Sequence, residues 1–185
     1  MVHEPDAIIV SIQVGKIQDM NYEAEDNPEY RAWQSAIFKT PVQGPAYVGE
    51  LGLEGDDQAD KYHHGGPEQA VMLYSADHYS FWKQDLEIPD LPFGAFGENI
   101  TVSVLNETNV HELDTYQIGD VLLQVTRLRQ PCWKQERRLE RPGLIKKIVN
   151  KGWSGWYHKV LVPGYIEAGM SVKLVDRVPN SVPLV

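Results

Sequence analysis

Short apolar runs recur along the chain, and glycine or proline separates most of them. The runs are four to eight residues long and rich in Val, Ile, Leu and Tyr, a composition typical of strands. They occupy residues 7–14, 70–74, 99–102, 121–126, 156–162 and 171–175. Because the edges of a sheet built from many short strands must be closed or covered, the pattern predicts a β-barrel or a β-sandwich.

Helices are expected in two regions. Ser75 is a suitable N-cap for a helix over residues 76–87, which carries an apolar stripe. A second helical region begins near Trp133, is interrupted at residues 141–143 and ends at Gly152. Proline at the start of its second piece and glycine just past its end are the usual helix boundaries.

The length of the chain and the absence of a linker predict a single domain. The chain has 185 residues and a mass of 21.0 kDa, which suits one well-filled core and is too short for two average domains. We expect this domain to span residues 1–178, with a C-terminal tail over residues 179–185. Residues 19–33 are polar and acidic, and we expect an ordered loop or a frayed helix there.

The sequence predicts a cytoplasmic protein that does not enter a membrane. No apolar run approaches the roughly 18 residues that span a bilayer, and the first residues lack the basic and apolar regions of a signal peptide. The single cysteine permits no internal disulfide, in agreement with a reducing compartment.

Charge is divided unevenly along the chain. Residues 1–126 carry 5 Lys and Arg against 22 Asp and Glu, whereas residues 127–185 carry 12 against 4. The acidic body would repel a polyanion and there is no long basic run, so nucleic acid is not an expected partner. The asymmetry instead predicts a local site for a compact anion. For most of the six cations from Arg137 to Lys151, the solvent face of a helix pair is the preferred interpretation, but it explains Arg129 less well because Arg129 lies before the helix.

Two segments rich in glycine and polar residues could hold a ligand. In residues 52–67, closely spaced Asp and His side chains, among them His64, suit a divalent metal such as Zn²⁺ or Mn²⁺, or else the carboxylates only cap turns. In residues 93–100, Asn99 and the backbone amides near Gly97 could donate to a heterocycle or a phosphate, or else form a tight turn into a strand. The composition of these segments does not distinguish between a ligand site and a turn.

Cys132 lies in the only strongly basic part of the sequence. The thiolate is the reactive and metal-ligating form of cysteine, and the cationic neighbours Arg129 and Lys134 favour it, as does a helix that starts just after it. The alternative is an inert, buried small side chain.

Taken in order along the chain, several of these motifs resemble the MOSC domain, which is named for the C-terminal region of molybdenum cofactor sulfurases. The resemblance covers roughly residues 6–176 and is greatest to the single-domain YiiM-type bacterial proteins. It rests on the segments Ser35–Val42, Gly52–Asp60, His64–Pro67, Phe96–Asn99, Gly119–Asp120, Arg129–Lys134 and Gly155–Tyr157.

The resemblance implies a mainly β protein with some α, a MOSC-type β-barrel with added helices near the C-terminal half. It also implies binding of the molybdenum cofactor, a molybdopterin whose metal is ligated by the cysteine of the motif. Carried over by position, Cys132 is the expected molybdenum ligand and catalytic residue. The residues expected to contact the cofactor are Lys39, His64, Gly65, Asn99, Arg129 and Cys132.

The activity implied by the resemblance is reduction of small N-hydroxylated compounds such as hydroxylaminopurines. No flavin or haem motif is evident, so the electrons are expected from an external donor protein. The alternative is a sulfur carrier or cofactor-handling protein that uses a Cys132 persulfide, and a binding module without catalysis is a third reading. The oligomeric state stays open, a homodimer included.

Overall fold

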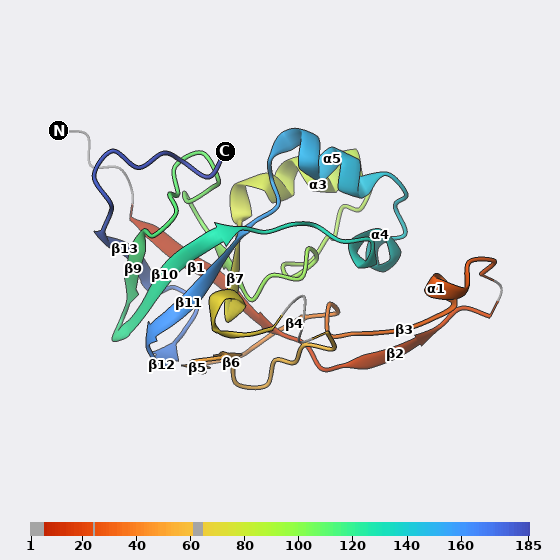
Figure 1. Cartoon of the computed structure of the whole chain (residues 1–185), viewed down its shortest axis with the longest axis horizontal. Coiled ribbons are helices and arrows are strands. Elements are labelled where there is room, and N and C mark those ends of the chain that lie inside the picture. Colours follow the sequence, from red (N-terminus) through yellow and green to blue (C-terminus); the bar gives the residue numbers. More distant parts are fainter. Residues whose placement is uncertain (1–5, 24, 61–64) are drawn as a thin grey trace.

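Seven strands form a closed β-barrel in the computed structural model, which describes residues 6–23, 25–60 and 65–185 (Figure 1). Their order is β13-β9-β10-β11-β7-β8-β1, and the pairing of β1 with β13 closes the ring. The bounds are β1 (Ala7–Val14), β7 (Val71–Ser75), β8 (Ile100–Val102), β9 (Thr115–Ile118), β10 (Val121–Leu128), β11 (Trp156–Val162) and β13 (Ser171–Asp176). The predicted mainly β barrel with added helices is confirmed, and the sandwich alternative is wrong.

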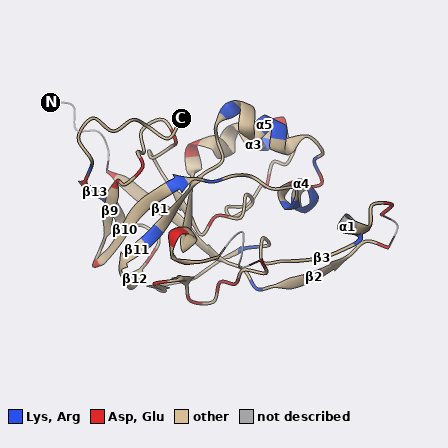
Figure 2. Ribbon diagram, viewed as in Figure 1, with Lys and Arg blue, Asp and Glu red and all other residues tan. Residues whose placement is uncertain are grey.

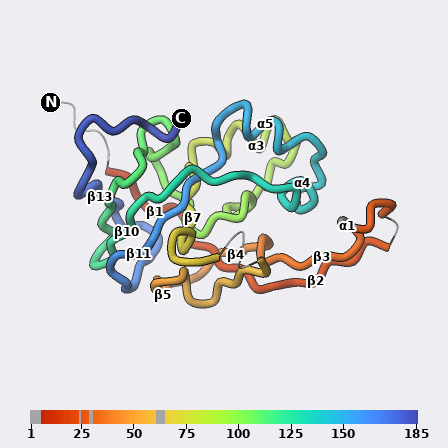
Figure 3. Tube along the Cα trace, viewed as in Figure 1, coloured from red at the N-terminus to blue at the C-terminus, as the bar shows by residue number. Residues whose placement is uncertain are grey.

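The remaining strands lie outside the ring. A long hairpin of β2 (Gln18–Asn21) and β3 (Ala32–Ser35) projects away from the barrel and carries α1 (Pro28–Arg31) near its tip (Figure 3). We refer to residues 18–35 as the arm. The shorter strands are β4 (Thr40–Pro41), which pairs with β1, and a small sheet of β5 (Ala46–Gly49), β6 (Gly52–Leu53) and β12 (Gly164–Ile166).

The loop or frayed helix expected over residues 19–33 is therefore wrong, apart from the single turn of α1. The hairpin depends on Trp33, which is buried and meets the ring of Trp133 edge-on with centroids 5.3 Å apart. Its partner lies 100 positions further along the chain, so the local pattern around Trp33 gives no sign of this packing.

The helices follow the predicted boundaries closely. Ser75 Oγ accepts a hydrogen bond from the Asp77 amide at 3.3 Å, and Gly152 ends the last helix in the left-handed region. The helical elements are η1 (Pro67–Gln69), η2 (Ala76–His78), α3 (Tyr79–Asp85), α4 (Lys134–Leu139) and α5 (Leu144–Lys151). None of the helices in the described part of the chain is long and apolar enough to cross a membrane.

Strand β7 separates two apolar cores. Val71 and Leu73 point into the barrel interior, whereas Met72 and Tyr74 belong to a second cluster beneath α3 and α5. These two helices lie side by side on one flank of the barrel (Figure 1). Burial on both faces explains why β7 reads as a continuous apolar run instead of an alternating one.

His158 is a fully buried, neutral side chain in strand β11. Burial is the main cause that lowers its pKa from 6.5 to about 3. Between these two values the unfolded chain binds a proton that the folded protein does not, so the folded state loses stability as the pH falls below 6.5. This group contributes a slope of up to about 1.4 kcal/mol per pH unit.

We expect replacement of His158 by Gln to remove this contribution. Chemical denaturation of both proteins from pH 7 to pH 4 gives the free energy of unfolding, and the decline towards low pH should be less steep in His158→Gln. Equal slopes in the two proteins would show that the pKa of His158 is the same in the folded and unfolded states.

The C-terminal tail lies against the body of the domain. The amides of Leu184 and Val185 donate to the carbonyls of Val110 and Glu107, at 2.9 and 3.1 Å. Apart from an isolated bridge between His111 and Pro183, residues 179–185 form no helix or strand.

Candidate functional site

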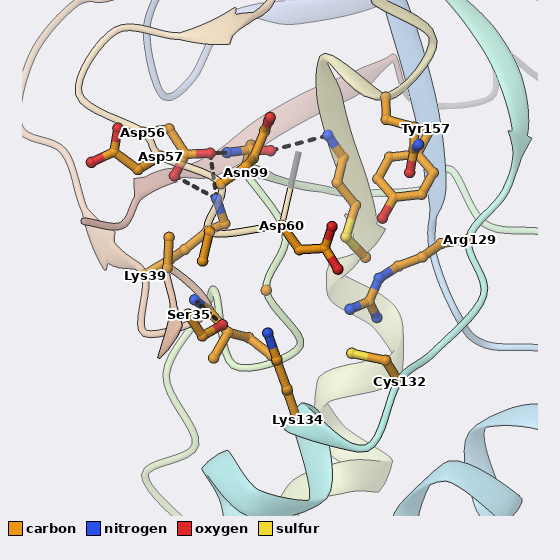
Figure 4. A pocket seen from close by; sticks show the side chains of 17 residues that line it. Ser35, Lys39, Asp56, Asp57, Asp60, Asn99, Arg129, Cys132, Lys134 and Tyr157 are labelled. Atoms are coloured by element: carbon orange, nitrogen blue, oxygen red, sulfur yellow. Dashed lines mark hydrogen bonds and ion pairs between the residues drawn. The ribbon is translucent and has the colours of Figure 1, made fainter. Parts of the chain in front are cut away.

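Four separate parts of the chain meet around one pocket, which we name the cysteine pocket (Figure 4). The four are the segment after β3, the loop that follows β6, the turn before β8 and the segment between β10 and α4, and further lining residues come from η1, β7 and β11. The described residues that line the pocket are Ser35, Ala36, Ile37, Lys39, Asp56, Asp57, Gln58, Ala59, Asp60, Gln69, Met72, Gly97, Asn99, Arg129, Cys132, Lys134 and Tyr157.

Arg129 supplies a buried positive charge to this pocket. Its amide donates to the Gly155 carbonyl at 2.9 Å, which continues the pairing of β10 with β11 and fixes the backbone. The side chain is 5% exposed, and its Nε and Nη1 have no hydrogen-bond partner among the described residues. A buried guanidinium without partners is costly, so this arrangement favours an anionic ligand in the pocket.

Gly97 allows the opposite wall to approach this arginine. Its φ is 88°, and a Cβ on it would lie 3.1 Å from Ile37 Cγ1 and 3.8 Å from Arg129 Nη2. A side chain here would be strained and would fill the space next to the guanidinium. The glycine therefore keeps that side of the pocket open.

Asp56 joins the two other predicted cofactor contacts. Both of its oxygens lie 2.5 Å from Lys39 Nζ, and Oδ2 accepts a bond from Asn99 Nδ2 at 2.8 Å. The side-chain amide of Asn99 also donates to the Gln13 carbonyl and accepts from the Met72 amide, so both of its donor hydrogens are used. Lys39 has one ammonium hydrogen beyond its two bonds to Asp56.

Burial also disfavours the charged form of Lys39. Removal from water lowers the pKa of Lys39 below its ordinary value, although the charge of Asp56 acts in the opposite direction. Since Lys39 is neutralised by its ion pair, Arg129 is the stronger attractor for an anion.

Cys132 lies between Arg129 and α4, with its half-buried free thiol at the pocket. Its carbonyl accepts a bond from the Gln135 amide at 3.0 Å, and this bond ties it to the first turn of the helix. The thiol is thus held on an ordered backbone, as a metal ligand or a nucleophile requires.

The cations of α4 fasten the arm to the pocket. Lys134 Nζ donates to the Gln34 carbonyl at 2.8 Å, Arg137 pairs with Glu25, and Arg138 donates to the carbonyls of Ile37 and Gly94. The prediction that these cations only form the solvent-exposed face of a helix is therefore wrong for Arg137 and Arg138 of α4. It fits α5 better, where Lys146 is exposed.

Glu98 holds the turn that presents Gly97 and Asn99. Its fully buried carboxylate accepts bonds from the Gly94 amide at 2.7 Å, the Phe96 amide at 3.2 Å and Thr101 Oγ1 at 3.0 Å. Tyr79 donates a fourth bond. Burial, with Glu98 as a second cause, raises the pKa of Tyr79 well above its ordinary value, so the phenol keeps the donated proton.

We expect Glu98→Gln to destabilise the protein by about 3 kcal/mol, because an amide can accept from these donors with only one oxygen and leaves others unpaired. Chemical denaturation measures the change, and the exposed Glu167→Gln serves as a control. A loss as small as that of the control would show that the carboxylate does not organise the turn.

Four of the six predicted contact residues, namely Lys39, Asn99, Arg129 and Cys132, line the cysteine pocket. Gly65 is described but does not line it, and His64 lies outside the described residues. The proposed divalent-metal site has no support in the described segments, which hold no group of three His, Cys, Asp or Glu side chains suited to a metal. The sequence did not identify the organising roles of Asp56 and Glu98, because these depend on partners that only the fold brings near.

The sequence of the chain matches the family profile described as MOSC domain over residues 60–173. It is also 37% identical over 175 residues to "Protein YiiM" of Escherichia coli (strain K12), covering 92% of this chain and 73% of that protein. The chain belongs to the MOSC domain family. This confirms the resemblance inferred from the motifs.

Two further relatives and a crystal structure are similar to this MOSC protein over different shares of their own length. The "Uncharacterized protein YflK" of Bacillus subtilis (strain 168) is 34% identical over 169 residues, covering 91% of this chain and 73% of that protein. A "Reductase" of Gibberella moniliformis is 38% identical over 146 residues, which are 77% of this chain but only 26% of that protein. The crystal structure of YiiM from Geobacillus stearothermophilus superposes with a TM-score of 0.76 at 35% identity, covering 96% of this chain and 80% of that chain.

Proposed function

We propose that this MOSC protein binds the molybdenum cofactor in the cysteine pocket and reduces small N-hydroxylated compounds such as hydroxylaminopurines. The observation that carries the proposal is the buried guanidinium of Arg129 beside the thiol of Cys132, since its Nε and Nη1 have no hydrogen-bond partner among the described residues. A soft sulfur donor next to a buried cation suits a metal held by an anionic organic group.

Five of the residues that line the pocket have a part in this proposal. Cys132 provides the sulfur ligand, and Arg129 provides charged donors to the phosphate of the pterin. Lys39 adds its remaining hydrogen, while Asp56 holds Lys39 in place and is itself held by a bond from Asn99. When bound, the cofactor would supply a metal that exchanges two electrons and takes up an oxygen atom.

The overall reaction consumes two electrons and two protons per N–O bond broken, and it yields an amine and water. The electrons are assigned to an external donor protein. The fungal relative supports this part, since it is named a reductase and holds a segment like this chain within a much longer protein. We propose a single MOSC domain over residues 1–178 that acts on a small molecule and not on nucleic acid.

The proposal is tested with protein produced in cells that make the cofactor. Product amine per bound molybdenum is measured with reduced methyl viologen as electron donor, for the wild type and for Cys132→Ala. The wild type should turn over a hydroxylaminopurine and the variant should not. Loaded wild-type protein that shows no turnover but releases sulfur from Cys132 would favour the sulfur-carrier function instead.

A further inference from the structure

A second groove lies beside the cysteine pocket and shares Arg129 with it. We name it the outer groove. Its described lining residues are Leu128, Arg129, Gln130, Pro131, Ile145, Val149, Gly152 and Ser154. It is thus formed by the segment that leads from β10 to Cys132 on one side and by α5 on the other. Pro131 directly precedes Cys132, so the two cavities are separated by little more than this segment.

The outer groove is apolar and accessible. Leu128, Pro131, Ile145 and Val149 are apolar residues of its lining, and Val149 is 60% exposed. An aliphatic side chain that is largely in water, within a concave apolar surface, is typical of an interaction site.

The surroundings of the outer groove are basic, although the protein as a whole is acidic. Helix α5, which forms one side of the groove, carries Lys146, Lys147 and Lys151 and no acidic residue, and none of the described residues that line the groove is acidic. Arg127 and Lys146 are exposed next to lining residues on either side. Figure 2 shows Lys and Arg on α4, on α5 and at the end of β10.

We propose that the outer groove is the docking site of an acidic electron-donor protein, an inference that rests on the proposed reductase function. An apolar centre with a basic rim complements a donor whose redox group is surrounded by carboxylates. Electron transfer weakens steeply with distance, so a donor must dock close to the residue that ligates the metal. The outer groove meets this need, because its wall includes the residue adjacent to Cys132.

Two other occupants fit the groove less well. A second copy of this chain in a two-fold symmetric pair would bring its own basic rim against this one, and like charges oppose such pairing. The small substrate needs access to the thiol side of the segment, which is the cysteine pocket itself. The net charge of the rim therefore selects an acidic macromolecule.

Docking is measured directly, without reliance on turnover. The probes are two acidic carriers, a flavodoxin with one flavin and a ferredoxin with a [2Fe–2S] cluster, and binding is followed by titration calorimetry. Val149→Asp should weaken binding by about tenfold or more, because it places a negative charge in the apolar centre. The matched control is Val175→Asp, since Val175 is 50% exposed on β13, far from the groove, and should leave binding unchanged.

Binding should also weaken as salt is added, since exposed charges attract the carrier. If neither carrier binds the wild type, or if Val149→Asp binds like the control, the docking proposal is overturned. Both substitutions are at exposed positions, and thermal melting confirms that the variants are folded.

Turnover measured with two electron donors distinguishes failure of the docking proposal from failure of the proposed reductase function. Val149→Asp should slow reduction driven by the reduced carrier protein and leave reduction driven by methyl viologen unchanged. An equal loss with both donors would place the effect in the cysteine pocket and overturn the docking proposal. Absence of turnover with methyl viologen in the wild type would instead refute the reductase function, while the binding measurements still decide whether the groove receives an acidic protein.

Discussion

Cys132→Ser should lose at least about nine tenths of its bound molybdenum, because a hydroxyl is a far poorer ligand than a thiolate for a soft metal centre. Serine is close to cysteine in size, and Cys132 is only half buried, so the barrel should remain intact. Elemental analysis of protein from cofactor-producing cells measures the loss, and thermal melting of the cofactor-free forms checks the fold.

Ser35→Ala is the matched control for this substitution. Ser35 lines the same pocket, and its hydroxyl accepts a bond from the Ile37 amide, so its removal alters the wall without touching the thiol. We expect this variant to retain most of its molybdenum. Full metal content in Cys132→Ser would show that the sulfur is not the ligand.

Arg129→Met should have opposite effects on the two forms of the protein. In the cofactor-free form, the buried guanidinium lacks partners for Nε and Nη1, so an apolar side chain of similar length should raise the free energy of unfolding by about 1–2 kcal/mol. In the loaded form, the variant should lose cofactor about tenfold more readily, because charged donors to the phosphate are gone.

Denaturation of the cofactor-free protein and the rate of molybdenum loss on dialysis give the two quantities. Arg127→Met is a suitable control, since Arg127 is an exposed arginine of β10 outside the cysteine pocket. A variant that is less stable without cofactor would mean that Arg129 supports the fold. A variant that retains cofactor like the control would remove Arg129 from the cofactor site.

The barrel was predictable because most of its strands are recognisable from local sequence, as short apolar runs. Each of the six apolar runs coincides with one strand of the ring, and their glycine and proline boundaries lie at the strand ends. Strand β9 escaped notice because Thr115 and Gln117 interrupt its apolar residues. It is recognisable as a strand only through its neighbours β10 and β13.

The sequence identified only some of the residues of the site, and it did so by different signals. Charge and uniqueness in the sequence pointed to Arg129 and Cys132, whereas Lys39 was found only through the family resemblance. The sequence could not show that Asp56 binds both Lys39 and Asn99, since these contacts join residues 17 and 43 positions apart. Nor could it show that α4 holds the arm, because the Lys134 bond to Gln34 spans 100 positions.

Closure of the barrel between β1 and β13 has a consequence for when the protein can be loaded. Ala7 of β1 pairs with Val172 of β13, so the ring cannot close until β13, its last strand, has been synthesised. Before β13 is present, the edges of β1 and β9 that pair with it are unpaired and exposed, and the barrel strands next to the pocket lack their final register. If the chain binds the cofactor as proposed, insertion would follow translation of the whole domain, and a nascent chain stalled before residue 171 is expected to need protection from aggregation.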